Sequence, residues 1–199
     1  MLFGFQPQRV NWYDSRPFTS TVYTYMNIQL KDITQDIEIN VTTALKEDLG
    51  DAGPKEGDIT AQLIPAAQCD VAEVITREDC VVCGIPWFNE TFRQVEGVNT
   101  IEWLVEEGQE IKANQVLVRL KGNSRALLTG ERTALNFLQM LSGTATLAKQ
   151  YAKALGDSSI TLLDTRKTIP GLRIAQKYAV SVGGCHNHRI GLYLSLIHI

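Results

Sequence analysis

The sequence predicts an α+β domain with an antiparallel sheet, followed by the beginning of an α/β-barrel domain. Several short β-type segments follow one another between residues 71 and 120. A long helix of small and apolar residues comes next, and then the strand–loop–helix order that is typical of a parallel α/β unit. That unit starts only at Ile160 of 199 residues. Because a closed eight-fold barrel needs roughly 250 residues, we expect the barrel to be incomplete in this chain.

Composition limits the classes of function. Hydrophobic residues make up 44% of the 199 residues and charged residues 21%, as in globular rather than disordered or fibrous proteins. The formal net charge of −3 argues against nucleic acid as a partner, because nucleic-acid binding needs a basic excess. No apolar run is long enough to span a membrane, so we expect no membrane partner. Four cysteines are too few for a disulfide scaffold, which favours reduced thiols and a cytoplasmic location.

The N-terminal segment, residues 1–25, differs from the rest of the chain. Its aromatic residues follow neither helical nor strand spacing. No basic segment leads into an apolar stretch, so the segment is not a secretory signal. We expect Met26 or a nearby residue to be the true start and residues 1–25 to be a non-native or disordered extension.

We assign residues 26–143 to a first domain. Its opening helix runs from about Ile37 to Leu49, where apolar residues recur at helical spacing, and Gly50 ends it. Glycine and proline residues between positions 53 and 57 then predict a loop. A helix over Trp87–Val95 interrupts four predicted strands, which are Val71–Arg77, Cys80–Cys83, Thr100–Val105 and Val116–Leu120.

The long helix crosses into the second domain, residues 144–199, and ends at Gly156. Its stripe is rich in alanine, which lets another element pack close to it. The stripe consists of Ala134, Leu138, Leu141, Ala145, Ala148, Ala152 and Leu155. The apolar segment Ile160–Leu163 is predicted to be a buried parallel strand. A helix over Leu172–Val182 follows, and Gly183-Gly184 ends it.

Charged residues gather in the two loops that follow these elements. Arg166 and Lys167 come directly after the predicted strand, where α/β folds place their active sites. Arg189 lies in the next loop, and we expect the three cations to converge if successive strands are neighbours. Such a cluster suits a small ligand with several negative charges, because arginine pairs with carboxylate or phosphate through two parallel hydrogen bonds. The alternative is a solvated loop with surface charges.

Several motifs occur in the same order as in a known enzyme family. In the C-terminal part they are Asp164-Thr165-Arg166-Lys167-Thr168-x-Pro170-Gly171-Leu172-Arg173, Lys177-Tyr178-Ala179-Val180, Gly183-Gly184 and Asn187-His188-Arg189-x-Gly191-Leu192. Upstream they are Glu47-Asp48-Leu49-Gly50, Gly57-Asp58-Ile59-Thr60, Leu128-Thr129-Gly130-Glu131-Arg132-Thr133-Ala134-Leu135-Asn136 and Leu141-Ser142-Gly143. Over about residues 30–192, the chain resembles the quinolinate phosphoribosyltransferases, also called nicotinate-nucleotide pyrophosphorylases (carboxylating).

The resemblance implies a pentosyltransferase of NAD biosynthesis. Members of the family transfer phosphoribosyl from 5-phosphoribosyl 1-diphosphate to quinolinate and release carbon dioxide and pyrophosphate, which gives nicotinate mononucleotide. The resemblance also implies an N-terminal open α/β sandwich before the barrel domain, and a homodimer or higher oligomer. Mg²⁺ is implied as a cofactor bound with the diphosphate co-substrate, without metal ligands in this chain.

The resemblance further implies which residues form the site. Thr165, Arg166 and Lys167 resemble the family's substrate-binding loop, and His188 and Arg189 its second anion-binding pair. Arg132 resembles an arginine that reaches the active site of the partner subunit. The implied substrate-binding residues are therefore Arg132, Thr165, Arg166, Lys167, His188 and Arg189, and all except Thr165 are also implied to be catalytic.

The sequence departs from the family pattern at two places. Cys185 stands where a third glycine is usual, which we expect to tighten the turn before His186. After Leu192 the family continues to an active-site lysine and to acidic residues, whereas this sequence reads differently over 193–199. We therefore expect this ending to come from a truncated reading frame, and the chain to be inactive. We also expect Ile160–Leu163 and Leu172–Val182 to present unpartnered apolar faces.

Other interpretations stay open at this point. Cys80 and Cys83 have the spacing of half a zinc or redox site. Residues 102–122 superficially resemble a biotinyl or lipoyl carrier module, although no lysine is expected at an exposed hairpin tip. A non-catalytic or transport-associated paralogue of the same fold would keep the motifs. Arg173 and Lys177, on the last predicted helix, are interpreted as structural.

Overall fold

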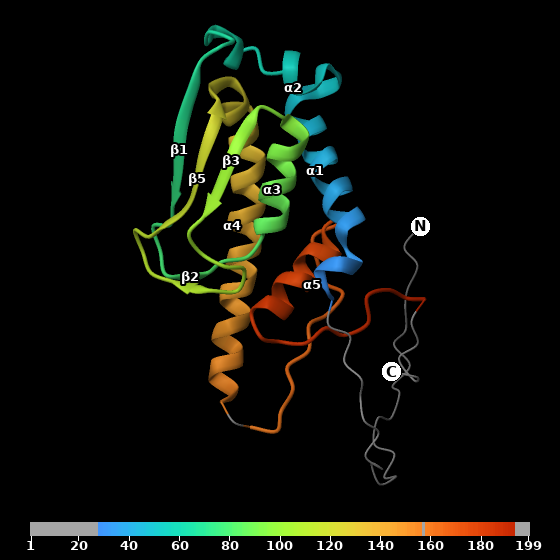
Figure 1. The fold of residues 1–199 in the computed structure, drawn as a ribbon. Coiled ribbons are helices and arrows are strands. Elements are labelled where there is room, and N and C mark those ends of the chain that lie inside the picture. The colour runs from blue at the N-terminus through green and yellow to red at the C-terminus, as the bar shows by residue number, and fades with distance from the viewer. Residues whose placement is uncertain (1–27, 157, 194–199) are drawn as a thin grey trace, which may run out of the picture.

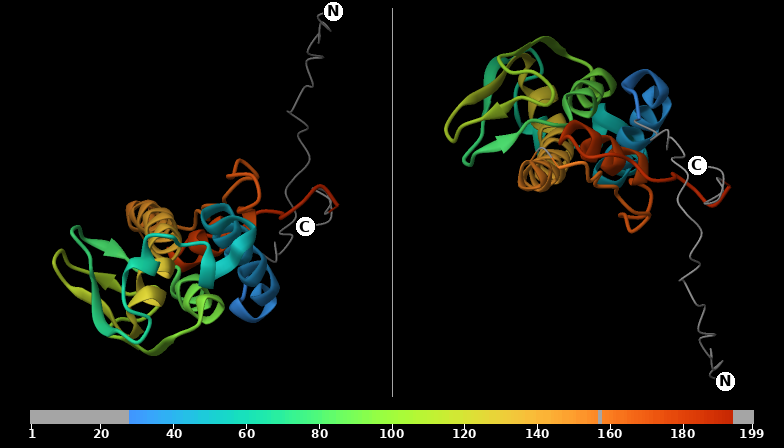
Figure 2. Two further views of the ribbon diagram at one scale, coloured as in Figure 1. Left: turned by 90° about the horizontal axis from the view of Figure 1, so that it is seen from above. Right: turned by 90° about the horizontal axis from the view of Figure 1, so that it is seen from below.

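The computed structural model describes residues 28–156 and 158–193, which form three layers (Figure 1). A three-stranded sheet forms one side. The helices α3 (Ile85–Val95) and α4 (Ser124–Leu155) form the middle layer, and α1 (Thr34–Leu49) and α5 (Arg173–Val182) pack on its other side. The end-on views of Figure 2 show the sheet and α1 on opposite sides of α4. The predicted extension, residues 1–25, lies outside the described residues.

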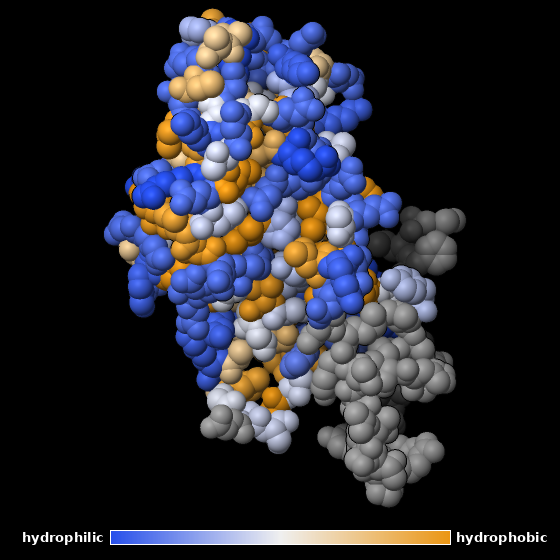
Figure 3. Space-filling model, in the orientation of Figure 1, coloured by the Kyte–Doolittle hydropathy of each residue, from blue (hydrophilic) through white to orange (hydrophobic). Residues whose placement is uncertain are grey.

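The predicted antiparallel sheet is confirmed. β5 (Val116–Asn123) lies in the centre, with β1 (Cys69–Ile75) and β3 (Val98–Trp103) antiparallel on its two sides. A separate two-residue ladder joins β2 (Cys80–Val81) to β4 (Glu110–Ile111). Side chains alternate between the helix-covered face and the outer face. Apolar side chains remain visible between polar ones on the surface shown in Figure 3.

Two hydrophobic clusters lie on the two sides of the middle layer. One cluster fills the space between the sheet and the helices α3 and α4, and includes Phe88, Val118 and Leu138. The other joins α1 and α5 to α3 and α4, and includes Val41 and Trp87. Burying one large apolar side chain stabilises the folded state by roughly 1.5–3 kcal/mol. The two clusters therefore hold the three layers together.

The first helix ends as predicted, but the segment after it is more regular than the expected loop. Gly50 has a φ of +64°, a conformation that favours glycine. A 3-10 turn over Gly50–Ala52 then leads into the short helix α2 (Gly53–Glu56). Pro54 lies in the first turn of α2. Backbone N–H groups in the first turn of a helix have no helical acceptor, so proline, which lacks this group, costs no hydrogen bond there. Two further 3-10 turns are Leu30–Asp32 and Ala61–Leu63.

The small-residue stripe of α4 admits a close neighbour, as predicted. α4 is one helix of 32 residues, and the Asn123 side chain caps its N-terminus by accepting two backbone hydrogen bonds. Gly183, at the end of α5, lies against the middle of α4. A β-carbon at Gly183 would lie 2.4 Å from the Ala145 carbonyl oxygen and 2.5 Å from the Ala148 β-carbon. The alanines of α4 and this glycine therefore fit together.

The prediction of a buried strand at Ile160–Leu163 is wrong. Ile160 is 66% exposed, and the segment forms one isolated parallel bridge, between Leu163 and His186. A buried parallel strand needs hydrogen-bonded neighbours and covered faces. Within residues 28–156 and 158–193, this segment pairs only with the backbone around His186.

The expectation of an unpartnered helix over Leu172–Val182 is also wrong. α5 buries Ala175, Tyr178 and Ala179 in the cluster that it shares with α1, α3 and α4. Because this cluster lies within the described chain, the apolar face of α5 is covered without any further element.

Candidate anion-binding site

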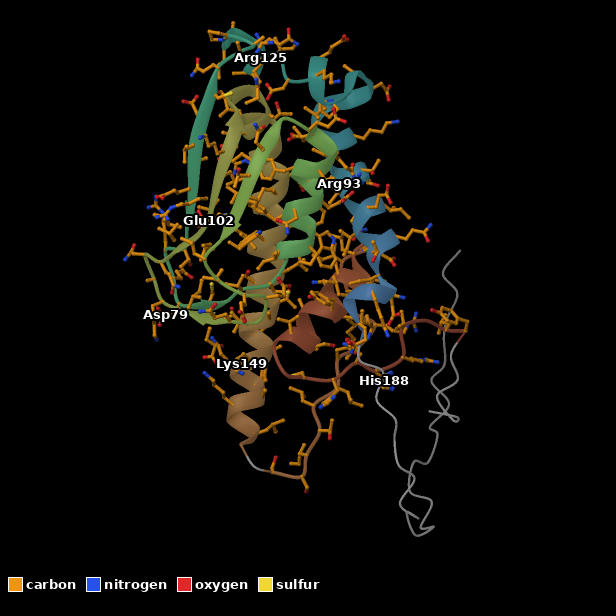
Figure 4. The ribbon with its side chains drawn as sticks, in the orientation of Figure 1. Asp79, Arg93, Glu102, Arg125, Lys149 and His188 are labelled. Atoms are coloured by element: carbon orange, nitrogen blue, oxygen red, sulfur yellow. The ribbon has the colours of Figure 1, made fainter. Side chains whose placement is uncertain are left out.

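The parallel bridge brings the two predicted site loops side by side. His186 donates its backbone N–H to the Leu162 carbonyl, and its own carbonyl accepts the Asp164 N–H, both at 3.0 Å. Residues 164–171 and 187–191 leave this bridge, and α5 joins the two loops in sequence. Figure 4 shows His188 near α5, on the side of the molecule away from the sheet.

The first loop is held by its own hydroxyl groups and by α5. Thr165 accepts the backbone N–H of Lys167 at its Oγ1 atom, at 3.0 Å. Arg173, at the start of α5, donates from Nε to the Thr168 hydroxyl at 3.2 Å. Arg173 also donates to the Ile190 carbonyl at 3.2 Å, so it touches both loops. The structural interpretation of Arg173 therefore fits its contacts.

Arg166 and Lys167 have different surroundings. Arg166 is half-buried, and its Nε atom is buried with no hydrogen-bond partner in the described part of the chain. An unsatisfied buried donor costs about 1–3 kcal/mol, and a ligand oxygen could remove that cost. Lys167 is exposed. The pair therefore offers one desolvated and one solvated cation on the same loop.

A buried polar cluster connects this loop to the next one. The Lys177 side chain has no exposed surface, and its Nζ donates to Asp164 Oδ1 at 2.5 Å and to the His188 carbonyl at 3.1 Å. Asp164 also accepts the His188 backbone N–H at 2.7 Å and the Asn187 side-chain amide at 3.0 Å. One positive and one negative charge thus lie together, as buried charges require.

The second loop is fixed through its backbone. Both bonds of His188 to the cluster use its N–H and carbonyl, so they do not need its imidazole ring. Arg189 follows directly and is half-buried. The structure therefore places Thr165, Arg166, Lys167, His188 and Arg189 in two adjacent loops. Their convergence on one ligand stays a prediction.

Arg132 lies on α4 and not in either loop. It is exposed on α4 and lines a cavity of about 210 Å³, together with Glu47 and Asp48 of α1. Neither Arg166 nor Lys167 lines that cavity. Within the described residues Arg132 forms no ion pair with the neighbouring Glu131, and its role toward a partner subunit stays a prediction.

Sequence reasoning placed Asp164 and Asn187 in motifs without giving them a role, and gave Lys177 only a structural interpretation. The pattern of α5 gave no signal of burial at this position, because at about 3.6 residues per turn Lys177 lies on the side of the helix opposite Ala175 and Ala179, where a lysine is expected to be exposed. A lysine is almost never fully buried unless it is paired. The burial that the structure shows therefore requires a partner, and Asp164 supplies it.

The cysteines have structural surroundings. Cys185 is buried, its backbone does not adopt a positive φ, and its thiol donates to the Ala148 carbonyl at 3.3 Å. Burial raises the pKa of Cys185. Cys80 and Cys83 pack in different hydrophobic clusters. No group of three or more His, Cys, Asp or Glu side chains within residues 28–156 and 158–193 is arranged to hold a metal ion.

Comparisons with known proteins agree with this arrangement. The family model for the N-terminal domain of quinolinate phosphoribosyl transferase matches residues 58–142, and the model for the C-terminal domain matches residues 144–197. The solved nicotinate-nucleotide pyrophosphorylase of Francisella tularensis is 46% identical, with a TM-score of 0.74 over 80% of this chain and 55% of that one.

Two plant relatives are similar over 161 residues. Quinolinate phosphoribosyltransferase [decarboxylating] 1 of Nicotiana glauca is 37% identical, over 80% of this chain and 44% of its own length. The chloroplastic nicotinate-nucleotide pyrophosphorylase [carboxylating] of Oryza sativa subsp. japonica is 39% identical, over 80% of this chain and 42% of its own length. The chain thus spans about half the length of the curated relatives it matches. By these matches and its collinear motifs, the chain belongs to the quinolinate phosphoribosyltransferase family.

Proposed function

We propose that this chain belongs to an enzyme that transfers phosphoribosyl from 5-phosphoribosyl 1-diphosphate to quinolinate, with decarboxylation to nicotinate mononucleotide, in NAD biosynthesis. The observation that carries the proposal is the buried Arg166 Nε, which lacks a hydrogen-bond partner among the described residues. A carboxylate or phosphate oxygen is the partner that a guanidinium group binds best. The names of the similar relatives support this choice of reaction.

The two loops suit the charges of this reaction. Quinolinate carries two carboxylates, and the co-substrate carries a phosphate and a diphosphate. When the diphosphate leaves, positive charge develops at the anomeric carbon and negative charge on the leaving group. Cations on a fixed backbone, such as Arg166, Lys167 and Arg189, would stabilise that leaving charge without reorganising. The ring nitrogen of quinolinate is the nucleophile, so the protein need not supply one.

Mg²⁺, which the resemblance implies, does not fit a site built from the described residues. No group of three or more metal-ligating side chains lies together in them. The acidic residue nearest the loops, Asp164, already uses both carboxylate oxygens for Lys177, Asn187 and His188. We therefore assign no step to a metal held by this part of the chain.

We further propose that the enzyme is a homodimer and that it works in the cytoplasm. An exposed Arg132 beside a cavity could reach a second copy of the chain, which supports a dimer. All four cysteines are free thiols, as is usual in a reducing compartment. None of the helices in the described ranges combines the length and apolar character that crossing a bilayer requires.

Calorimetric titration of the purified chain with quinolinate tests the proposal. We expect binding, and at least tenfold weaker binding after Arg166→Ala. Arg93→Ala is the matched control, because Arg93 is 62% exposed and pairs with Glu90 on α3. Equal affinities of all three proteins would overturn the assignment of Arg166, and no binding by the unmodified chain would overturn the proposal for this chain. Carbon dioxide release by a protein of the relatives' full length then separates an enzyme from a non-catalytic paralogue.

A further inference from the structure

We propose that Lys177 is a positioning residue that fixes the separation of the two anion-binding loops and does not itself bind substrate. The inference rests on the proposed function, because it takes quinolinate as the ligand of those loops. It starts from the weak backbone link between them. The isolated bridge at Leu163 and His186 supplies two backbone hydrogen bonds, whereas neighbouring strands are normally held by a continuous ladder.

Lys177 supplies a buried link from α5, in addition to the contacts that Arg173 makes with both loops. Its ammonium group reaches Asp164 in the first loop at 2.5 Å and the His188 carbonyl in the second at 3.1 Å. Asp164 then accepts the His188 backbone N–H at 2.7 Å and the Asn187 amide at 3.0 Å. These four hydrogen bonds make a closed connection between the loops, and a helix packed in the core anchors it.

The geometry distinguishes Lys177 from the cations proposed to bind ligand. Its side chain has no exposed surface, and its charge is matched by Asp164, which is 9% exposed. A substrate carboxylate could reach Lys177 only by displacing this partner. Removing one partner of a buried ion pair strongly destabilises a protein. The charge of Lys177 is therefore neutralised by a buried carboxylate, whereas Lys167 is exposed to solvent.

The cluster acts on the site through the backbone of His188. Arg189 is the next residue, so a shift of His188 moves both residues relative to Arg166. A ligand with two carboxylates needs its cations at a fixed separation, and small displacements from the productive geometry are costly. Loosening the cluster should therefore weaken ligand binding even when the protein stays folded.

The test removes both charges together. In Asp164→Asn/Lys177→Met no buried charge is left alone, and neutral replacements of buried ion pairs often leave stability unchanged. Asp79→Asn/Lys112→Met is the matched control, because that pair, 2.7 Å apart, is exposed. The measurements are thermal unfolding, hydrogen exchange of the His188 amide by NMR, and quinolinate affinity.

We expect the double variant to melt within a few degrees of the unmodified chain. Its His188 amide should exchange at least tenfold faster while core amides such as that of Val118 keep their rates. Its quinolinate affinity should fall at least tenfold, the equivalent of about 1.4 kcal/mol, and the control should change neither quantity.

Unchanged His188 exchange and unchanged affinity would overturn the inference. So would a uniform rise in exchange at all amides, because it would show a role in global stability alone. If the double variant does not fold, Asp164→Glu keeps both charges and lengthens the carboxylate by one methylene, and it must then show the same two effects. If the unmodified chain does not bind quinolinate, the proposed function fails for this chain, and the His188 exchange still decides whether the Asp164–Lys177 pair holds the second loop in place.

Discussion

Replacing Gly183 by alanine tests the close packing between α4 and the loop that carries His188 and Arg189. The new β-carbon would lie 2.4 Å from the Ala145 carbonyl oxygen, 2.5 Å from the Ala148 β-carbon and 3.1 Å from the Lys149 nitrogen. All three atoms belong to the backbone or to β-carbons of α4, so no side-chain rotation can relieve the contacts. The segment after α5 would have to move away from α4.

The expected loss follows from two opposing effects. Overpacking in a well-packed site costs about 1–3 kcal/mol. Gly183 has a φ of −73°, which alanine adopts without strain, so alanine also lowers the entropy of the unfolded chain and returns about 0.4–1 kcal/mol. We expect a net loss of about 1–2 kcal/mol. For a chain of this length that lowers Tm by about 2–8 °C.

Gly143→Ala is the matched control. Gly143 lies in the middle of α4, and a β-carbon there would meet nothing within 4 Å. Alanine should stabilise the helix at this position by about 0.5–1 kcal/mol. Thermal unfolding followed by circular dichroism measures both variants. A Gly183→Ala protein as stable as the unmodified chain, beside a stabilised Gly143→Ala protein, would refute the packing argument.

Four further outcomes are expected. Arg166→Lys in a full-length protein should lower kcat/KM for quinolinate by the equivalent of about 1–3 kcal/mol, because lysine keeps the charge but loses the bidentate geometry; an unchanged value would count against the assigned role. The purified 199-residue chain should form no nicotinate mononucleotide, and measurable product would contradict this. Mixing full-length Arg132→Ala and Arg166→Ala proteins, each inactive alone, should restore roughly one working site per mixed dimer, and mixed dimers without activity would exclude a role across subunits. Burial raises the pKa of Glu107 in the folded chain. The protonated Glu107 therefore stabilises the folded state fully below the ordinary glutamate pKa, and this stabilisation is lost as the pH rises through the raised pKa. The free energy of unfolding, measured with urea, should fall less over this pH range in Glu107→Gln.

Regular elements with a strong apolar period could be predicted from the sequence. Ile37, Val41, Leu45 and Leu49 recur at helical spacing, and all four are buried on α1. The alanine stripe of α4 predicted a close neighbour, because small side chains allow backbones to approach. In both cases the spacing of residues along one element determines the face that is buried.

The segment Ile160–Leu163 could not be judged in the same way. Its apolar residues are those of a buried strand, but the burial of a strand depends on neighbours that the segment itself does not encode. Only the backbone around His186 pairs with it in the described chain, and Ile160 is left 66% exposed. The apolar composition of this segment therefore indicated that it pairs in parallel, but it did not indicate that Ile160 is exposed.

The site residues show the same contrast between a local pattern, which the sequence reveals, and a contact with a distant residue, which it does not. Arg166, Lys167 and Arg189 were singled out because they lie in loops where α/β folds place their active sites and within motifs that resemble those of the family. Lys177 was not visible as a linking residue, because its importance comes from a contact with Asp164 across 13 residues of chain. A pattern on one helix cannot show which distant carboxylate neutralises a buried lysine.

The next residue on α5 gives that lysine a further connection. Tyr178 lies about 100° further around the helix, and its ring centroid is 5.5 Å from that of Trp87 on α3. It also hydrogen-bonds the half-buried Glu107, whose carboxylate accepts the backbone N–H groups of Gly84 and Ile85 at 2.9 and 3.0 Å. One helix thus contacts α3 through Tyr178 and the two loops through Lys177. The position of the loops depends on α5, and the position of α5 depends on the start of α3.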